Sequence, residues 1–199
     1  MITKNQLIEI GINEKWLEPL NNSFDKYGVV SINEKAMFLA QTSHESVNYK
    51  RLEESFNYTP KRLLEIFKKR VGTLDNAKRL CSEGAEAIAN FVYGGRKDLG
   101  NEKDEGYKYR GRGIIQLTGK NNYAYYGKKL NIDLVNNPDL AKEPDTAMEI
   151  AMLFWKEKGC GLFAKNGDVK AVTRLINGGY NGLADRQKRF ERILKILQG

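Results

Sequence analysis

The 199-residue sequence has two cysteines, one histidine and no long apolar run. Cys81 and Cys160 are too few for the disulfide framework of a small secreted scaffold, and we expect both to be reduced thiols. A structural zinc site needs about four Cys or His ligands, and the three such residues of this chain are widely separated. Serine–histidine chemistry could use only His44, and the sequence has no G-x-S-x-G turn. We therefore expect no metal and no organic cofactor.

Long apolar segments are missing as well. Residues 1–6 lack the apolar stretch of a secretory signal. The longest uncharged run, Leu175–Ala184, is glycine-rich and shorter than the roughly 18 residues that a membrane helix needs. We therefore expect synthesis in the cytoplasm, no stable membrane insertion, and a separate exit route for any task outside the cell.

Acidic residues are fewer than basic ones, and the net charge is +8. Residues 1–58 hold 6 basic and 8 acidic side chains, whereas the rest of the chain holds 27 and 17. Such a field favours an anionic partner: nucleic acid, an acidic membrane surface or a bacterial wall. Lysine used only for solubility is the alternative that composition leaves open.

Helical patterns dominate the segments that are present. Ser31–Glu34 is a capping-box pattern that predicts a helix running towards Glu45. Thr59 and Pro60 are typical of an N-cap and a first helical residue. Apolar residues with helical spacing predict two further helices. They are Ala147, Ile150, Ala151, Phe154 and Trp155, before a stop at Gly159, and Phe190, Ile193, Leu194 and Leu197. No repeat or linker is visible, so we predict one domain over residues 1–199.

Residues 113–118 (GIIQLT) depart from the helical pattern and predict a short strand or hairpin. Alternation would place Gln116 and Thr118 on one face of this element, where an amide and a hydroxyl suit a sugar chain or a positioned water. Thr118 is also placed to cap the next helix, which contains Asn122. The alternative is a hairpin buried under helices, with Gln116 as an ordinary satisfied side chain. The patterns together predict a mainly α fold with a small β element.

Residues 41–46 (QTSHES) place a carboxylate where the helix from Ser31 should end. The negative end of the helix dipole disfavours the ionised form of Glu45, as partial burial would, and a general acid needs the protonated form. Glu53 and Glu54 follow eight and nine residues later. Glycoside hydrolysis needs two carboxyl groups, one to protonate the leaving oxygen and one to activate water or attack. On spacing alone, an ordinary solvated helix end is the better explanation of these glutamates.

Taken together, these segments resemble glycoside hydrolase family 19, the chitinase-like family that includes many phage endolysins. The resemblance runs from about Phe38 to Arg189. Its four segments follow the family's order: 38–45 (FLAQTSHE), 109–118 (YRGRGIIQLT), 176–179 (INGG) and 184–186 (ADR). The resemblance implies a lysozyme-like α+β domain, with helices around a catalytic cleft and a small β-hairpin. It also implies an enzyme that inverts anomeric configuration.

The resemblance further implies roles for single residues. Glu45 matches the general acid, Glu54 in segment 51–58 (RLEESFNY) matches the general base, and Thr118 matches a Ser/Thr that helps hold the attacking water. Glu53 stands beside Glu54, so this assignment could be off by one. The residues expected to bind the substrate or support the acid are His44, Tyr58, Gln116, Asn122, Asn177 and Arg186.

The expected substrate is peptidoglycan, cut at the β-1,4 bond between N-acetylmuramic acid and N-acetylglucosamine, because the chain is compact, basic and without a cysteine-rich chitin-binding module. We expect a monomer with no nucleic-acid partner. It would be released from the host cytoplasm through a holin and act in the periplasm or cell wall. A chitinase, a non-catalytic basic protein that binds wall or nucleic acid, and a secreted antibacterial effector are the alternatives.

Overall fold

The chain is mainly helical, as predicted, in a computed structural model that describes residues 1–199. It forms two compact units, and the chain passes between them four times. Unit 1 comprises Met1–Leu52, Gly113–Ile115 and Lys142–Gly199, and unit 2 comprises Glu53–Arg112 and Gln116–Ala141. The assignment of one catalytic domain to residues 1–199 stays a prediction.

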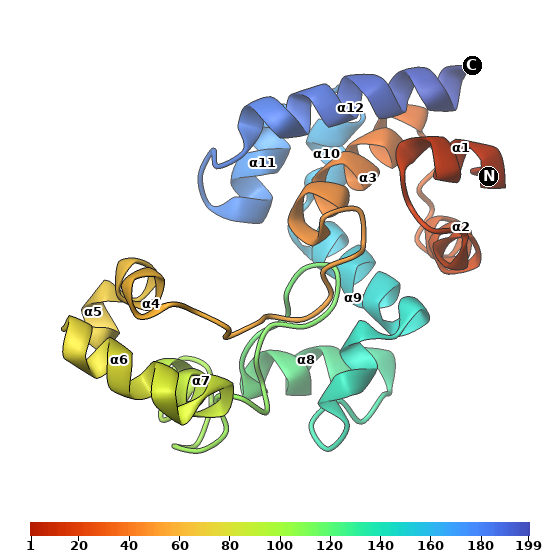
Figure 1. Cartoon of the computed structure of the whole chain (residues 1–199). Coiled ribbons are helices and arrows are strands. Elements are labelled where there is room, and N and C mark those ends of the chain that lie inside the picture. The colour runs from red at the N-terminus through yellow and green to blue at the C-terminus, as the bar shows by residue number, and fades with distance from the viewer. The chain divides into compact units, whose positions relative to one another are not determined.

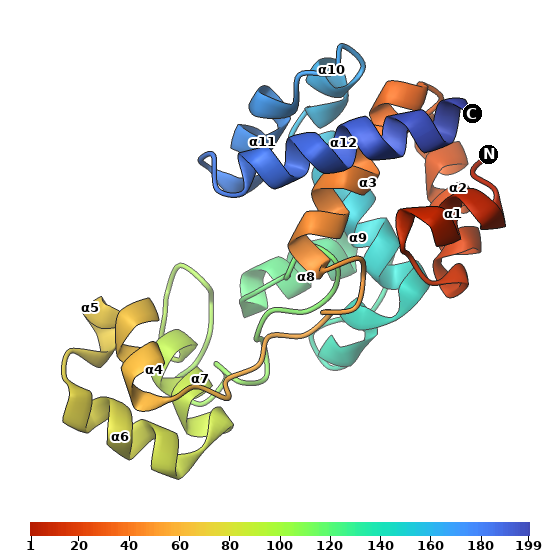
Figure 2. The same cartoon turned by 45° about the horizontal axis from the view of Figure 1, so that its top comes forward.

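Unit 1 is built around helix α3 (Ile32–Ser46), which begins where Ser31 predicts. The Ser31 hydroxyl accepts a hydrogen bond from the backbone N–H of Glu34 (3.4 Å). Helix α12 (Leu183–Gln198) packs along α3, as both views show (Figures 1 and 2). The other helices of unit 1 are α1 (Lys4–Ile10), η1 (Glu14–Trp16), α2 (Leu17–Lys26), α9 (Pro144–Glu157), α10 (Cys160–Ala164) and α11 (Val169–Asn177).

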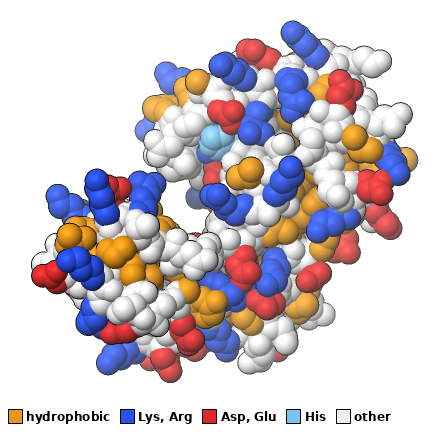
Figure 3. Space-filling view, in the orientation of Figure 1, with side chains coloured by type: hydrophobic (Ala, Val, Ile, Leu, Met, Phe, Trp, Pro, Cys, Tyr) orange, Lys and Arg blue, Asp and Glu red, His pale blue; other side chains and the backbone are white.

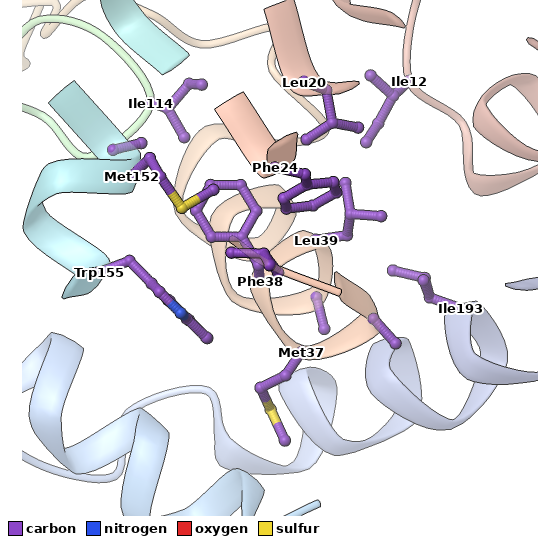
Figure 4. Close-up of a cluster of buried hydrophobic side chains, with 14 of the residues drawn as sticks. Ile12, Leu20, Phe24, Met37, Phe38, Leu39, Ile114, Met152, Trp155 and Ile193 are labelled. Carbon is purple, nitrogen blue, oxygen red and sulfur yellow. The ribbon is translucent and has the colours of Figure 1, made fainter. Parts of the chain in front are cut away.

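The core of unit 1 surrounds α3. Residues 36–43 are all buried, so this helix is covered on every face, which makes it the central element of the unit. The Phe38 ring meets the rings of Phe24 and Trp155 edge-on, with centroids 5.6 and 5.3 Å apart (Figure 4). Glu45 therefore projects from an element whose position is fixed by packing.

The capping box predicted at the start of α3 is only half formed. The Glu34 carboxylate does not return to the Ser31 backbone, because its Oε1 accepts a hydrogen bond from the Trp155 indole N–H (3.2 Å). Its Oε2 has no hydrogen-bond partner and lies 3.9 Å from Lys165 Nζ. Packing between α3 and α9 thus overrides the local capping pattern.

Unit 2 has a smaller core of its own. Its helices are α4 (Pro60–Ile66), α5 (Lys68–Val71), α6 (Leu74–Glu83), α7 (Ala85–Tyr93) and α8 (Lys120–Leu130). Thr59 caps α4 and Pro60 is its first residue, as predicted. The Phe56 ring contacts the Tyr93 ring edge-on (5.9 Å), which brings the end of α7 beside the segment that carries Glu54. The 3-10 turn η2 (Pro138–Lys142) lies where the chain passes back to unit 1.

Residues 113–118, predicted as a short strand or hairpin, form no regular strand, and only a minimal hairpin is present. Arg112 forms isolated antiparallel bridges with Glu53 and Leu117, and residues 113–116 make a turn between Arg112 and Leu117. Ile114 is buried in the core of unit 1. Gly113 and Gln116 have left-handed φ values of 74° and 54°, which an extended strand does not allow, so the β element is reduced to the two bridges.

The other boundaries lie close to their predicted places. Helix α9 ends at Glu157, and Gly159, with a φ of 66°, begins the next helix in the left-handed conformation that favours glycine. Cys81 and Cys160 are free thiols, as expected. None of the helices combines the length and the apolar character that crossing a bilayer requires.

Candidate active site

Glu45 is the penultimate residue of α3, at the helix end where the sequence places it. Its side chain is 28% exposed, so a ligand can reach the carboxylate. It forms an ion pair with Arg186, which is only 1% exposed. The Arg186 guanidinium also donates to Gln41 Oε1 (2.5 Å) and to the backbone oxygen of Asn181 (3.1 Å). The fork of one buried arginine therefore fixes the position of the Glu45 carboxylate.

A buried polar chain extends this arrangement to a third helix. Gln41 Nε2 donates to Thr173 Oγ1 (3.0 Å), so α11, α3 and α12 are connected through Thr173, Gln41 and Arg186 to Glu45. Fully satisfied networks of this kind rigidify the residues that they join. Asn177, the last residue of α11, is exposed and is not part of this chain of contacts.

His44 is held beside the acid by the first turns of α12. Its Nδ1 lies 2.7 Å from Asp185 Oδ2, which also accepts a hydrogen bond from Arg189 Nε (2.6 Å). The hydrogen bond with His44 is the largest cause that lowers the pKa of Asp185, and the hydrogen bond from Arg189 is the next. Gly182 packs against the imidazole, and a β-carbon there would lie 2.3 Å from His44 Cε1. The ring is thus clamped, which suits the predicted supporting role.

Glu54 lies in unit 2 with a different set of partners. Its Oε1 accepts a hydrogen bond from the Tyr93 hydroxyl (2.9 Å), and its Oε2 accepts one from the Gly111 N–H (3.2 Å). Burial raises the pKa of Glu54, while these two hydrogen bonds and the charge of Arg110 act in the opposite direction. The Glu54 carboxylate is therefore partly buried, and its two hydrogen-bond donors are uncharged.

Glu53 and Glu54, which the sequence leaves as alternatives, differ clearly in the structure. Glu53 forms an ion pair with Arg110, and its Oε1 lies 3.7 Å from Arg112 Nε. It also takes part in the bridge to Arg112. Glu53 is therefore engaged with two arginines, whereas the Glu54 carboxylate is held by a phenol and a backbone amide.

Three side-chain oxygens of unit 2 converge over Gly111. A β-carbon on Gly111 would lie 3.0 Å from Gln116 Oε1 and 3.3 Å from both Glu54 Oε2 and Thr118 Oγ1. That β-carbon would lie one bond length from the Gly111 Cα, so a water cannot occupy that point itself. A water farther out on the same face of Gly111 would donate its two protons to two of these oxygens. Gln116 adopts a left-handed φ of 54°, a conformation uncommon for a residue with a side chain, and such conformations cluster at functional sites.

Thr118 does not cap the helix that follows it, contrary to the prediction. Gly119 precedes α8 and provides no side-chain cap, while the Thr118 hydroxyl donates to the backbone oxygen of Gln116 (2.9 Å). Asn122 is exposed, and its amide donates to the backbone oxygen of Thr118 (2.7 Å). Asn122 therefore supports the position of Thr118.

Tyr58 belongs to the aromatic cluster of unit 2, where its ring meets Phe56 edge-on at 6.2 Å. Tyr93 and Gly111 are functional candidates that sequence reasoning missed. Tyr93 lies 39 residues from Glu54, and no local pattern connects them. The signal that could have pointed to Gly111 is the pair of glycines at 111 and 113, because glycine allows other atoms to approach the backbone closely. No group of three or more His, Cys, Asp or Glu side chains in the chain could hold a metal ion.

Comparison with known proteins places these residues in a family context. The family model of class I chitinases, glycoside hydrolase family 19, matches residues 21–161. A glycosyl hydrolase family 19 domain-containing protein of Haemophilus influenzae (strain Rd) is 38% identical over 178 residues, which are 89% of this chain and 86% of that protein. An endochitinase of Arabidopsis thaliana is 31% identical over 166 residues, which cover 79% of this chain and 44% of that protein.

Solved structures agree with the fold. Chitinase C from Streptomyces griseus HUT6037 matches with a TM-score of 0.63 and 20% identity, over 99% of this chain and 92% of that one. A bacterial family 19 chitinase matches with a TM-score of 0.64 and 20% identity, over 98% and 94%. The predicted lysozyme-like, mainly α fold class is thereby confirmed.

Proposed function

Since this chain belongs to glycoside hydrolase family 19, we propose that it is a peptidoglycan hydrolase that cleaves the β-1,4 bond between N-acetylmuramic acid and N-acetylglucosamine with inversion. The glycoside hydrolase class follows from the family. The bond, the stereochemistry and the residue roles are the proposal. The observation that carries it is the convergence of the Glu54, Gln116 and Thr118 oxygens on one point above Gly111.

In the proposed mechanism Glu54 is the general base. A water held beside these oxygens donates one proton to Glu54 Oε2 and its other proton to the Gln116 or the Thr118 side-chain oxygen, since the Thr118 hydroxyl proton is used on the Gln116 backbone. Because burial raises the pKa of Glu54, the carboxylate is a stronger base than an exposed glutamate and remains suited to work near neutral pH. Tyr93 holds the other carboxylate oxygen and prevents rotation of the group.

Glu45 is the general acid of the proposal and protonates the leaving glycosidic oxygen. The Arg186 contact fixes its carboxyl group, and the partial exposure of the side chain leaves it accessible to the sugar. An ion pair with arginine stabilises the charged carboxylate, contrary to the protonated form expected at this helix end, so the proposal requires Glu45 to take up a proton when the sugar binds. Inverting glycosidases keep their two carboxyl groups about 6.5–9.5 Å apart, which leaves room for the water between them. The proposal therefore requires that separation when a sugar chain is bound.

The charge of the molecule supports peptidoglycan as the substrate. The chain carries a net charge of +8, and Lys and Arg side chains stand across the face shown in Figure 3, interspersed with acidic ones. Peptidoglycan carries carboxylates, whereas chitin is neutral, so a basic surface attracts only the former. Host-cell lysis after release through a holin, with action in the periplasm or cell wall, is the biological setting of this proposal.

Chitin hydrolysis is the second candidate, because several similar proteins are named as chitinases. Purified peptidoglycan and soluble chitin oligomers, assayed side by side, separate the two functions. Digestion of peptidoglycan in heavy-oxygen water, followed by mass analysis of the fragments, identifies the bond and shows that water closes the reaction. Fragments from chitin alone would contradict the peptidoglycan proposal.

The residue roles are tested with Glu45→Gln and Glu54→Gln. Each change keeps the size of the side chain, and loss of a general acid or base lowers the rate by roughly 10²- to 10⁴-fold. Glu86→Gln, at an exposed glutamate of α7, is the matched control and should retain the wild-type rate. A folded Glu45→Gln or Glu54→Gln variant with the wild-type rate would show that its assignment is wrong.

A further inference from the structure

A groove of unit 1 lies over α10 and α11, and its lining residues take no part in the chemistry proposed above. Its volume is about 720 Å³, within the range of small-ligand sites. The lining residues that matter here are Lys158, Phe163, Asp168, Lys170, Arg174 and Tyr180. We refer to this cavity as the α11 groove.

The α11 groove is formed on the polar face of an amphipathic helix. Val169, Val172 and Thr173 are the buried residues of α11, whereas Lys170 and Arg174, one helical turn apart, are exposed. Both cations therefore point towards the same side of the helix, away from the core.

The cations of the groove have no anionic partner in the chain. Lys158, Lys170 and Arg174 form no ion pair; Lys170 Nζ lies over the Tyr180 ring, 5.3 Å from its centroid. The one acidic residue of the lining, Asp168, is engaged as the N-cap of α11, where it accepts a hydrogen bond from the backbone of Ala171 (2.9 Å). With three cations and one carboxylate, the lining has a net charge of +2 (3 − 1), which makes the groove complementary to a carboxylate-bearing ligand.

Two exposed aromatic rings give the groove an apolar surface between these charges. Phe163 is 41% and Tyr180 is 47% exposed. Rings of this kind pack against sugar faces and small apolar side chains, while flanking cations bind carboxylates. A short peptide with free carboxylates, attached to a glycan, combines both requirements.

We infer that the α11 groove binds the carboxylate-bearing peptide stems of peptidoglycan, at a position distinct from the Glu45 carboxylate. The inference rests on the proposed function and gives it a substrate specificity, because neutral chitin offers no carboxylate to these cations. Gly178 lines the groove next to Asn177, a residue expected to contact the sugar chain. A stem bound in the groove thus lies beside a glycan that reaches Asn177.

The test compares charge reversal in the groove with an equal charge reversal elsewhere. Lys170→Glu/Arg174→Glu is the groove variant, and Lys61→Glu/Lys69→Glu, at exposed residues of α4 and α5, is the matched control. Both are made in a Glu45→Gln background, so that binding to purified, insoluble peptidoglycan is measured by sedimentation without hydrolysis. Circular dichroism and thermal denaturation check that both variants fold.

The groove variant should bind peptidoglycan roughly tenfold more weakly than the parent, because attraction is replaced by repulsion, while the control stays within about twofold. Amidation of the peptidoglycan carboxylates with a carbodiimide and a neutral amine should abolish the difference between parent and groove variant. With Glu45 restored, the groove variant should cleave the carboxyl-amidated peptidoglycan at the wild-type rate.

Equal losses in groove and control variants would overturn the inference, since they would reflect net charge alone. So would a groove variant that weakens binding to duplex DNA or to anionic phospholipid vesicles as much as to peptidoglycan. Failure of the proposed function is seen separately, as absence of peptidoglycan cleavage by the wild type. The sedimentation result does not depend on cleavage and supports or overturns the groove by itself.

Discussion

The two glutamates proposed for catalysis are held by different means. Glu45 is fixed by the charge of Arg186, and Glu54 by neutral donors from Tyr93 and Gly111. A carboxylate beside a guanidinium keeps a fixed position through a strong, directional contact. Partial burial raises the pKa of the Glu54 carboxylate, and a carboxylate with a raised pKa is a better proton acceptor than an exposed glutamate. The proposed roles therefore lead to separate predictions for Glu54 and its neighbours.

Tyr93→Phe should move the acid limb of the pH–rate profile to higher pH. The Tyr93 hydrogen bond lowers the pKa of Glu54, so its removal raises that pKa further. A general base works only when ionised, and activity is therefore lost as pH falls through the pKa of Glu54. In the variant this loss begins at a higher pH, while the rate on the alkaline side stays close to that of the wild type. The measurement is kcat/KM from about pH 4 to 8.

Tyr27→Phe is the matched control for this variant. Tyr27 also donates its hydroxyl to a glutamate, Glu149 Oε2 (2.7 Å), but this pair joins the end of α2 to α9, and neither residue belongs to the proposed catalytic set. Its pH profile should coincide with that of the wild type. If the acid limb of the pH–rate profile were the same in Tyr93→Phe and the wild type, the assignment of Glu54 as the general base would be wrong.

Gly111→Ala should abolish most of the activity without unfolding the protein. The added methyl group would lie 3.0–3.3 Å from the Gln116, Thr118 and Glu54 oxygens and would crowd the space in which the proposal has them hold the water. Displacement of a reacting group by about 1 Å can lower a rate roughly 10²-fold, and we expect at least that loss in kcat. Thr118→Ser keeps the hydroxyl and should stay within about threefold of the wild type. A fully active, folded Gly111→Ala variant would refute the water position.

At the scale of elements, the sequence predicts what local patterns determine. The Ser31 cap, the helix that ends at Glu45 and the cap at Thr59 are present because each depends on residues within one turn. The pairing of Glu34 with Trp155 and of Glu54 with Tyr93 joins residues far apart in sequence, so no local pattern reveals it. Packing of distant elements decides such contacts.

The turn at residues 113–116 shows the same limit. Its composition is that of a strand, but burial of Ile114 in the core of unit 1 and the left-handed backbone of Gln116 give a turn instead. The outcome for the site is still close to the prediction, because Gln116 and Thr118 place their polar atoms on the same side, above Gly111. The sequence thus identified the residues of this element but not the backbone that presents them.

Arg186→Lys tests the contact between α12 and α3. Arg186 donates to Glu45, Gln41 and the Asn181 backbone from a fully buried position, and one ammonium group cannot reach all three acceptors. We expect the free energy of unfolding to fall by about 2 kcal/mol or more, since buried acceptors lose their partners. We also expect kcat to fall at least tenfold, because the Glu45 carboxyl loses its fixed position.

Urea denaturation and steady-state kinetics measure the two effects. Arg79→Lys, at an exposed arginine paired with Glu83, is the control and should change the free energy of unfolding by less than about 0.5 kcal/mol. Equal stability of Arg186→Lys and the wild type would show that the buried polar chain does not hold α12 against α3.

At the scale of the whole molecule, the family determines the fold and the reaction class, whereas charge and surface chemistry distinguish one substrate from another. A chain with 33 basic and 25 acidic residues has an overall attraction for anionic polymers. That overall attraction does not distinguish one anionic polymer from another. In the proposal, the α11 groove provides the specificity, because cations without ion-pair partners and exposed aromatic rings occur together there. The proposed substrate specificity therefore depends on a local arrangement rather than on net charge.

The free energy of unfolding should depend on pH because the charged Glu54 carboxylate is partly buried. Its pKa is raised in the folded state, so folding favours the protonated form, and the ionised carboxylate destabilises the fold. Below the ordinary pKa range of glutamate the group is protonated in both states and the penalty vanishes; the penalty is complete once pH exceeds the raised pKa. Glu54→Gln should therefore be more stable than the wild type at pH 7, by a margin that disappears near about pH 3.

Urea midpoints of the wild type, Glu54→Gln and Glu86→Gln at these two pH values measure the effect. Glutamine can accept the hydrogen bond from the Gly111 N–H with its one carbonyl oxygen and donate from its amide nitrogen to the Tyr93 hydroxyl, so both contacts can be kept and the main change is the loss of the charge. Glu86 is exposed, and its variant should show no gain that depends on pH. If Glu54→Gln were inactive and yet less stable than the wild type at pH 7, the loss of activity would reflect a damaged fold. A stable, inactive variant instead identifies Glu54 as a residue retained for the reaction at the expense of stability.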